Sequence, residues 1–277
     1  MNSGILNDKY SVLMSVYRND DPNFLTVAIE SMLNQTIPPE QFVIVEDGIV
    51  GDEIEEVVSK YEKNSSLFSI VRLEKNGGLG NALNHGLKVC RNDLVARMDA
   101  DDVSVPERCE KQLKAFAKNP DLKILGTQIK EFVGDTSNVV STRFVPTSFE
   151  EIKKFARRRS PFNHPTVMYK KEAVEKLGGY PILKRKEDLG LFVNAVNNAY
   201  YSENLDESLL FYRTSVENQK RRKTWVNCKE YIEVMYASFK KKQIGLADLA
   251  YVVFGQLMMY IAPLCITTKL SKKFLRR

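Results

Sequence analysis

A cluster of acidic side chains is the part of this sequence best suited to chemistry. Residues 97–102 read Arg-Met-Asp-Ala-Asp-Asp and follow the apolar run of residues 94–96. Carboxylates this close repel one another unless a cation lies between them, and Mg²⁺ or Mn²⁺ prefers oxygen ligands. Because open α/β sheets bind ligands at strand ends, the cluster predicts a metal shared with a diphosphate. The alternative is a solvated turn in which Asp102 or Ser104 caps a helix opened by Pro106.

The first 120 residues alternate between apolar runs and helical periodicity. Asp21 and Pro22 mark the start of the first helix as its N-cap and first residue. A helix is predicted after each of the first three strands, and the strands are placed at residues 10–17, 42–45, 67–73 and 93–98. This order predicts a parallel sheet covered by helices on both faces, as in nucleotide-binding α/β folds.

The second half is expected to be less regular. Its predicted elements are paired strands at residues 122–133 and 139–145, a helix after Ser148, a helix from Lys171 to Gly178, a helix from Glu187, and one or two strands within residues 200–212.

The C-terminal part is rich in lysine and ends in an apolar stretch. Residues 249–266 are apolar apart from Gly255, Gln256 and Pro263, with Asp248 before them and basic residues on both sides. A membrane span takes roughly 20 apolar residues, so this stretch is short for one. A helix lying in the membrane surface is favoured over a helix packed on the domain, and over a true span.

The net charge indicates which kinds of partner suit this chain, and the cysteines indicate its compartment. The chain has 277 residues and a formal net charge of +6 at pH 7, which suits a phosphorylated substrate, an anionic membrane or nucleic acid. Its lysines are dispersed and no RNP-type aromatic motif is present, so nucleic acid is not expected. The four cysteines form no CxxC pair and the N-terminus has no secretory pattern, which together predict a reducing cytosol.

Other polar residues leave two interpretations open. Asp47 ends a strand, where it either accepts hydrogen bonds from a base or ribose, or only caps a helix or forms a turn with Gly48. Glu187 and Asp188 open a helix, and they either deprotonate a hydroxyl or only favour the helix dipole. The three arginines at residues 157–159 form either a solvated face or a phosphate contact.

Two loops are candidates for ligand contact. Residues 76–86 offer close backbone approach and a helix start suited to a phosphate or ribose. Because Gly78, Gly80 and Leu83 do not complete a GxGxxG fingerprint, a dinucleotide site is not expected. His164 lies in a loop constrained by two prolines, where a substrate contact is plausible.

In their order and spacing these motifs resemble family 2 glycosyltransferases of the GT-A fold, especially bacterial enzymes that build capsular, exopolysaccharide and O-antigen repeat units. The resemblance covers residues 10 to about 213. It rests on residues 11–17, Val45-Glu46-Asp47-Gly48, Asn76-Gly77-Gly78-Leu79-Gly80, Met98-Asp99-Ala100-Asp101-Asp102, Asn163-His164-Pro165-Thr166 and Lys186-Glu187-Asp188.

The resemblance implies roles for individual residues. Asp101 would be the main ligand of Mg²⁺ or Mn²⁺, with Asp99 as its DxD partner. Asp188 would deprotonate the acceptor hydroxyl, supported by Glu187. The nucleotide would contact Ser15, Val16, Tyr17, Glu46, Asp47, Asn76, Gly78, Asn81, Asp99 and Ala100, and the acceptor would contact Asn163, His164 and Pro165.

The resemblance also implies a fold, the plan of residues 1–215 and a reaction, and the apolar, lysine-rich tail adds a C-terminal region. Residues 1–215 would form an α/β GT-A domain with a donor half at 10–120 and an acceptor half at 121–215. Residues 216–277 would form a helical, membrane-associating region. The expected reaction moves one sugar with inversion from a UDP sugar to a saccharide on a polyprenyl diphosphate, at the cytoplasmic face of the bacterial plasma membrane.

Two departures and two rival activities remain. Glu46 and Ile49 stand where the family commonly has Asp and Ser, and Trp225 comes two places late for the QxxRW motif of processive synthases, which favours single-sugar addition. A sugar-nucleotide nucleotidyltransferase would have a glycine-rich loop with a lysine and an arginine after the first strand, where this chain has Tyr-Arg-Asn-Asp. The other alternative is a non-catalytic basic module that binds membrane or nucleic acid.

Overall fold

A computed structural model describes residues 9–215 and 223–262 of the chain. The QxxRW-like segment from Gln219 to Arg222 lies outside the described residues. So do the last part of the predicted apolar stretch and the basic C-terminal residues, from residue 263 onward.

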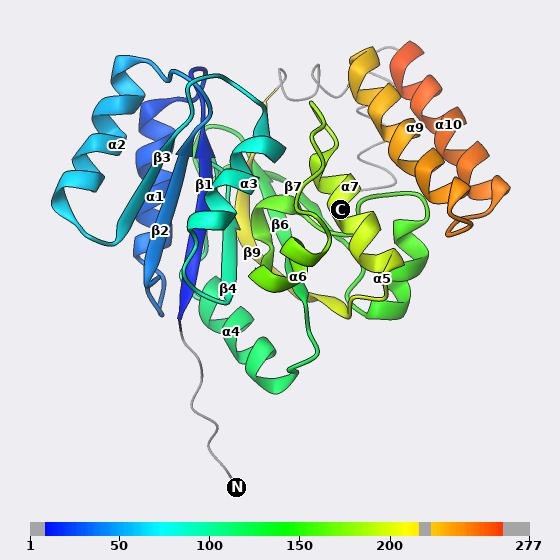
Figure 1. Ribbon diagram of the computed structural model, residues 1–277, viewed down its shortest axis with the longest axis horizontal. Coiled ribbons are helices and arrows are strands. Elements are labelled where there is room, and N and C mark those ends of the chain that lie inside the picture. The colour runs from blue at the N-terminus through cyan, green and yellow to red at the C-terminus, as the bar shows by residue number, and fades with distance from the viewer. Residues whose placement is uncertain (1–8, 216–222, 263–277) are drawn as a thin grey trace, which may run out of the picture.

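The first half is a parallel sheet with a helix after each of its first three strands (Figure 1). Its strands stand in the order β3-β2-β1-β4, and all pairings among them are parallel, which confirms the predicted alternation. Asp21 caps the first helix as predicted, because its side chain accepts hydrogen bonds from the N–H groups of Asn23 and Phe24. The elements are β1 (Tyr10–Val16), α1 (Pro22–Leu33), β2 (Gln41–Glu46), α2 (Asp52–Asn64), β3 (Phe68–Arg72), α3 (Leu79–Val89) and β4 (Leu94–Met98).

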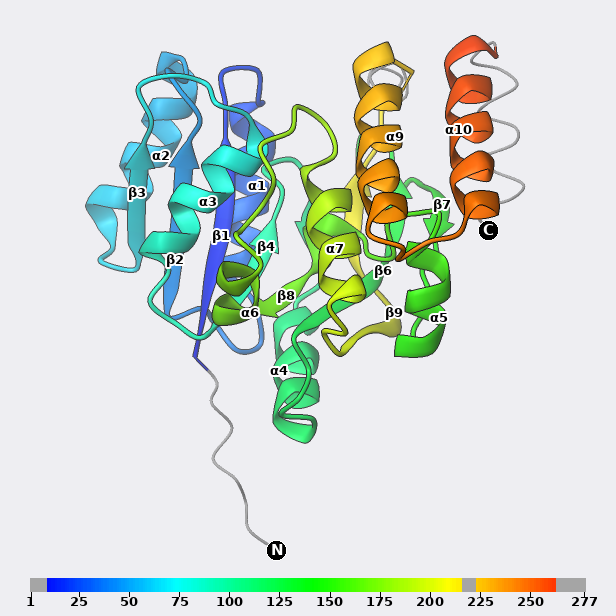
Figure 2. The same ribbon diagram turned by 45° about the vertical axis from the view of Figure 1, so that its right-hand side comes forward.

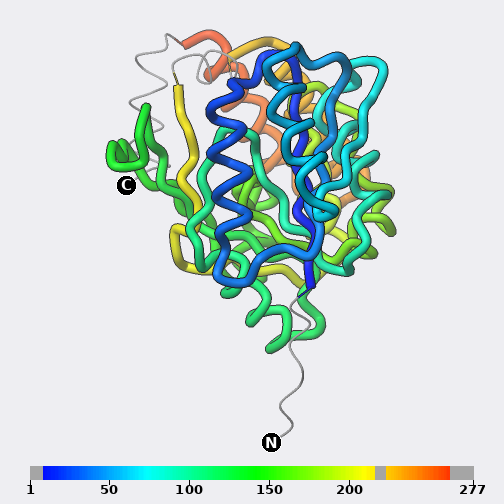
Figure 3. Tube along the Cα trace, turned by 90° about the vertical axis from the view of Figure 1, so that its left-hand side faces the viewer, coloured from blue at the N-terminus to red at the C-terminus, as the bar shows by residue number. Residues whose placement is uncertain are grey.

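The central strands are apolar on both faces because helices cover both (Figure 3). On one face α1 and α2 bury Leu25, Ile29 and Ile54 against the sheet. On the other face α3 lies so close that a Cβ atom at Gly86 would come within 2.4 Å of Leu13 Cδ1. Each buried side chain of this size contributes about 1.5–3 kcal/mol. This two-sided core is the rigid base that holds the strand ends in place.

The second half extends this sheet with antiparallel pairings. β8 pairs with β4 and with β6, β9 runs parallel to β6, and the predicted strand pair is confirmed as β6 with β7. The nine-stranded sheet has the order β3-β2-β1-β4-β8-β6-β9-β5, with β7 on β6. The added elements are β5 (Val103–Ser104), α4 (Arg108–Lys118), β6 (Ile124–Phe132), β7 (Val139–Arg143), α5 (Phe149–Ala156), η1 (His164–Thr166), β8 (Met168–Lys170), α6 (Lys171–Lys176), α7 (Glu187–Asn197) and β9 (Ser202–Arg213).

The helix after the acidic cluster begins later than the alternative interpretation required. α4 starts at Arg108 with Glu107 at its N-cap, so a helix opened by Pro106 and capped by Asp102 or Ser104 is wrong. Val103 and Ser104 instead pair with β9. Pairing with a strand far along the chain thus prevailed over a local helix signal.

Two C-terminal helices, α9 (Trp225–Lys240) and α10 (Leu246–Ile261), lie side by side at one edge of the molecule (Figures 1 and 2). Met235, Ile244 and Val252 of this hairpin pack against Leu189 and Val193 of α7. Among the described residues, no helix has the length and apolar character needed to cross a membrane. The apolar stretch is therefore helical as far as Ile261 and partly packed on the domain.

Candidate active site

The acidic cluster lies directly after β4, in the middle of the sheet. Carboxylate oxygens of Asp99, Asp101 and Asp102 lie within 4.8 Å of one another. Burial and the neighbouring Asp99 raise the pKa of Asp101 to about 6, and burial and Asp101 raise the pKa of Asp102 well above its ordinary value. Asp102 Oδ2 is buried and has no hydrogen-bond partner among the described residues. Oxygen ligands with this concentrated negative charge fit a Mg²⁺ or Mn²⁺ ion.

The charge of one buried arginine acts on both this cluster and the predicted catalytic pair. Arg97 is 1 % exposed and forms an ion pair with Asp99. Burial raises the pKa of both Asp101 and Glu187, and the charge of Arg97 offsets part of this rise. Glu187 is 7 % exposed, and burial followed by the charge of Asp188 raises its pKa to about 7. The acidic cluster after β4 and the Glu187–Asp188 pair are thus both subject to the charge of one buried guanidinium.

The pair Glu187 and Asp188 opens α7, as predicted, and α3 positions this first turn. A Cβ atom at Gly80 would lie 3.0 Å from Glu187 Cβ and 2.7 Å from the carbonyl oxygen of Pro181. Only glycine lets the first turns of α3 and α7 meet this closely. The first turn of α3, which belongs to the predicted donor half, is therefore in close contact with Glu187 of the predicted catalytic pair.

Asp47 serves the glycine-rich loop in this structure. Its Oδ1 accepts the N–H of Gly77 at 2.7 Å and its Oδ2 accepts the N–H of Gly78 at 2.9 Å. Gly48 has φ +81°, and a Cβ atom there would lie 2.5 Å from the backbone nitrogen of Asn76. Asp47 is 4 % exposed. Its carboxylate therefore holds the loop that edges the predicted nucleotide site, a role that neither sequence interpretation included.

A cleft of about 460 Å³ opens where the loops after β1, β2 and β3 come together. It contains three of the predicted nucleotide contacts, Tyr17, Asp47 and Asn76. Sequence reasoning missed its other lining residues, although the charge of the residues next to Asn76 was a usable signal. These are Arg18, Asn19, Ile49, Glu74 and Lys75.

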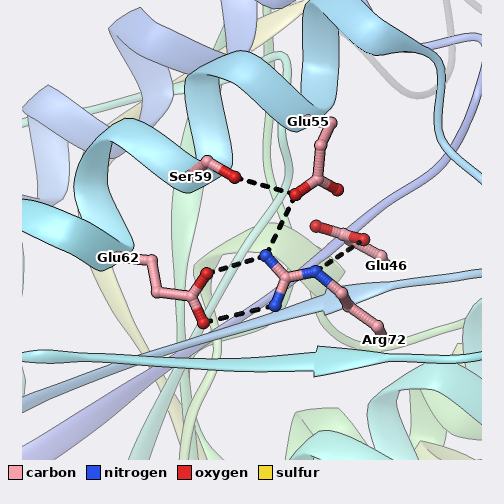
Figure 4. A network of polar contacts seen from close by, with 5 residues as sticks. All are labelled: Glu46, Glu55, Ser59, Glu62 and Arg72. Atoms are coloured by element: carbon pink, nitrogen blue, oxygen red, sulfur yellow. Dashed lines mark hydrogen bonds and ion pairs between the residues drawn. The ribbon is translucent and has the colours of Figure 1, made fainter.

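Glu46 does not line the cleft and contacts Arg72 of β3 instead. It is 4 % exposed and lies 3.5 Å from Arg72, whose guanidinium also binds Glu55 at 3.1 Å and Glu62 at 2.7 Å (Figure 4). Burial, followed by the charge of Glu55, raises the pKa of Glu46 to about 7. The structure therefore places Glu46 in a network that ties β2 and β3 to α2, in contrast to the predicted nucleotide contact.

The remaining predicted nucleotide contacts surround the site without lining the cleft. Ser15 is half-buried at the end of β1, and Val16 is 1 % exposed with its side chain in the core. Asn81 is half-buried in the first turn of α3 and lies against Gly77, and Ala100 is 6 % exposed. Their backbone positions frame the site, but the side chains of Val16 and Ala100 serve packing.

The predicted acceptor residues are mostly internal. Asn163 is 1 % exposed and donates from Nδ2 to the carbonyl oxygen of Thr127 at 2.9 Å, and Pro165 is buried. These two residues support loop packing, which differs from the predicted acceptor contact. His164 is half-buried, with Nε2 3.1 Å from the Tyr180 hydroxyl. Burial and the charge of Arg97 lower the pKa of His164 well below its ordinary value, so the ring is neutral.

The arginine run at residues 157–159 binds the C-terminal hairpin. Arg158 Nε lies 2.6 Å from Asp248 Oδ1, and its guanidinium lies 4.7 Å from the centre of the Tyr251 ring. Arg159 donates to the Tyr251 hydroxyl at 3.2 Å. Arg158 remains exposed to solvent, and both it and Arg159 also contact α10, a partner that neither sequence interpretation included.

Solved structures share this fold. The chain superposes on S. aureus TarS 1-349 in complex with UDP-GlcNAc with a TM-score of 0.68 and 21 % identity, covering 96 % of this chain and 77 % of that one. It superposes on the Pyrobaculum calidifontis mannosyltransferase PcManGT, in complex with GDP-Man and Mn²⁺, with a TM-score of 0.58 and 14 % identity, covering 95 % and 74 %. The fold is therefore the α/β GT-A fold of these transferases.

Sequence comparison gives the family. Residues 11–178 match glycosyl transferase family 2. An uncharacterized glycosyltransferase of Haemophilus influenzae is 38 % identical over 97 % of this chain and 100 % of its own length. A UDP-Gal:alpha-D-GlcNAc-diphosphoundecaprenol beta-1,3-galactosyltransferase of Escherichia coli is 33 % identical over 97 % of both chains. This chain belongs to glycosyl transferase family 2, as its motifs predicted, and is a glycosyltransferase.

Proposed function

We propose that this chain is an inverting, metal-dependent enzyme that moves a single sugar from a UDP sugar to a growing, lipid-linked saccharide in cell-surface polysaccharide biosynthesis. One observation carries the proposal: Asp99, Asp101 and Asp102 converge within 4.8 Å at the end of β4 in a family 2 glycosyltransferase. The donor and acceptor in the name of the E. coli relative, and the UDP-GlcNAc bound to TarS, support this choice of substrates.

The site residues divide the chemistry between them. Asp101 and Asp99 would hold Mg²⁺ or Mn²⁺, which supplies positive charge for the departing diphosphate. Asp188 takes the proton of the acceptor hydroxyl. The hydroxyl oxygen bonds to the anomeric carbon of the donor sugar, and the bond from that carbon to the diphosphate oxygen breaks. Attack from the face opposite the leaving group inverts the anomeric centre. Glu187 supports Asp188, and Arg97 orients Asp99 through their ion pair.

The domain plan follows the same division. Residues 10–120, which carry the cleft and the acidic cluster, serve as the donor half. Residues 121–215, which carry α7 and His164, serve as the acceptor half, and residues 216–277 serve as the membrane-associating region. Of the three predicted acceptor residues, His164 is the one best placed to contact an acceptor. It is half-buried beside Tyr180, whereas Asn163 and Pro165 are buried.

A transfer assay with defined donors tests the function. With Mn²⁺ or Mg²⁺ we expect transfer from one of UDP-galactose, UDP-glucose and UDP-GlcNAc to GlcNAc on a synthetic lipid diphosphate, and no transfer in EDTA. Mass spectrometry identifies the product, and proton NMR reports its anomeric configuration. Transfer from GDP-mannose alone would contradict the donor, and formation of UTP from a UDP sugar and pyrophosphate would favour the nucleotidyltransferase.

We place the enzyme at the cytoplasmic face of the plasma membrane, in peripheral or monotopic contact through α10. This helix carries an exposed apolar face made of Leu246, Phe254, Leu257, Met258 and Ile261. Phe254 is 69 % exposed and Ile261 is 74 % exposed. Lys240, Lys241 and Lys242 are exposed at the turn of the hairpin and suit an anionic lipid surface.

Substitution on this apolar face is expected to release the protein from lipid. Burial of two such side chains is worth about 3–6 kcal/mol in total, so Phe254→Ser with Ile261→Ser should weaken binding to anionic vesicles at least tenfold. Sedimentation with phosphatidylglycerol vesicles and with phosphatidylcholine vesicles measures this. Val27→Ser, at an exposed valine on α1, is the control and should change nothing. Equal sedimentation of the double variant and the unmodified chain would refute the membrane contact.

A further inference from the structure

The loop that leads into the catalytic pair is held from outside its own helix. Lys186 occupies the N-cap position of α7, and a lysine side chain has no acceptor for the N–H groups of a first turn. Capping therefore does not set the start of this helix from within. What fixes residues 180–186 decides where Asp188 points.

A carboxylate from the C-terminal hairpin supplies one of these restraints. Glu230 lies on α9, is 9 % exposed, and accepts the N–H of Lys184 at 3.0 Å and of Arg185 at 2.8 Å, one with each oxygen. Hydrogen bonds to a charged acceptor are about twice as strong as neutral ones. Lys186 also lies over the Tyr231 ring at 5.3 Å, next to Glu230 on the same helix.

The other end of the loop is held from the donor side. Asn84 on α3 donates from Nδ2 to the carbonyl oxygen of Tyr180 and accepts its N–H with Oδ1, both at 2.8 Å. In Figure 2 α7 lies between α3 and α9, in agreement with their packing. The loop before Asp188 is thus clamped by α3 at its first residue and by α9 near its last.

We propose that Glu230 is a positioning residue for Asp188, so that α9 belongs to the catalytic frame as well as to the membrane-associating region. The inference rests on the proposed function, because it takes Asp188 as the base. Leu189 and Val193 of α7 share a buried apolar cluster with Met235 of α9, so the two helices are also packed together beyond the loop.

Removal of the Glu230 carboxylate should slow transfer without weakening donor binding. A displacement of about 1 Å at the reacting group costs on the order of 100-fold, so we expect Glu230→Ala to lower kcat about 10- to 100-fold. The KM for the donor and the affinity for UDP with Mn²⁺ should change less than twofold, because the donor cleft lies in another part of the sheet. Glu230→Gln keeps the shape of the side chain but not its charge, so its kcat should lie between those of Glu230→Ala and the unmodified protein.

The matched control is Glu233→Ala on the same helix. Glu233 is exposed, and among the described residues its ion pair is with Lys229 on the same helix surface at 3.6 Å, so its removal should leave kcat unchanged. Equal kcat values for the Glu230 and Glu233 variants would overturn the inference. Loss of UDP affinity in parallel with kcat, in both Glu230→Ala and Glu230→Gln, would also overturn it, since it indicates general loosening. If Asp188→Asn keeps full activity, the proposed base fails instead.

Discussion

Asp188→Asn is expected to lower the rate of sugar transfer by about 10²- to 10⁴-fold, the range that a general base contributes. The amide has the shape of the carboxylate but cannot take the acceptor proton. Asp188 lies on α7, away from the cleft formed by the loops after β1, β2 and β3, so UDP binding should remain within twofold. Single-turnover transfer and calorimetric titration of UDP separate these two effects.

Glu187→Gln is the natural comparison for this variant. Burial raises the pKa of Glu187 to about 7, so the neutral amide resembles a form that this residue already populates near neutral pH. We therefore expect a smaller loss than for Asp188→Asn. A folded Asp188→Asn protein that binds UDP and transfers sugar at the full rate would rule out Asp188 as the base.

Asp101→Ala is expected to abolish metal-dependent binding of UDP. It removes the proposed main ligand from the cluster, and the loss should exceed the roughly 10- to 100-fold that loss of an outer-shell partner costs. Calorimetric titration of UDP and GDP with Mn²⁺, with Mg²⁺ and with EDTA measures the effect. We expect tight UDP binding only in the unmodified protein with metal. GDP should not bind more tightly than UDP under any of these conditions.

The stability of the metal-free protein gives an independent check. The pKa of Asp101 is raised from 3.8 to about 6, so its ionisation disfavours the fold increasingly as pH rises between these values. Asp101→Asn removes this penalty, and its melting temperature in EDTA at pH 7 should equal or exceed that of the unmodified chain. Asp135→Asn, at an aspartate exposed in the turn between β6 and β7, is the control.

Metal-dependent UDP binding that survives in Asp101→Ala would refute the assigned ligand.

Local patterns were sufficient to predict most elements of the fold. The apolar run at residues 10–17, the Asp21-Pro22 start and the Gly178-Gly179 stop depend on interactions within a few residues, so they are visible in the sequence. Gly178 and Gly179 have φ of +87° and +78°, which other residues rarely adopt. The acidic cluster at the end of β4 was also predictable, because a strand that ends in three carboxylates leaves them at the edge of the sheet.

The roles of several site residues were decided only by which distant elements meet. Asp47 is adjacent in sequence to Gly48, yet its oxygens bind Gly77 and Gly78 because β2 and β3 are neighbours in the sheet. Arg158 reaches Asp248 on α10, and no spacing along the chain predicts that contact.

The sequence by itself determined the class of enzyme and most of the strands and helices, and it singled out the residues proposed to bind a metal or take a proton. Tertiary structure alone decided that Glu46 faces Arg72, that Asn163 is buried, and that Glu230 holds the loop before Asp188. The physical reason is range. Helix caps, turns and strand patterns depend on neighbours in the chain, whereas a side chain's hydrogen-bond partners depend on packing between elements that no local pattern brings together.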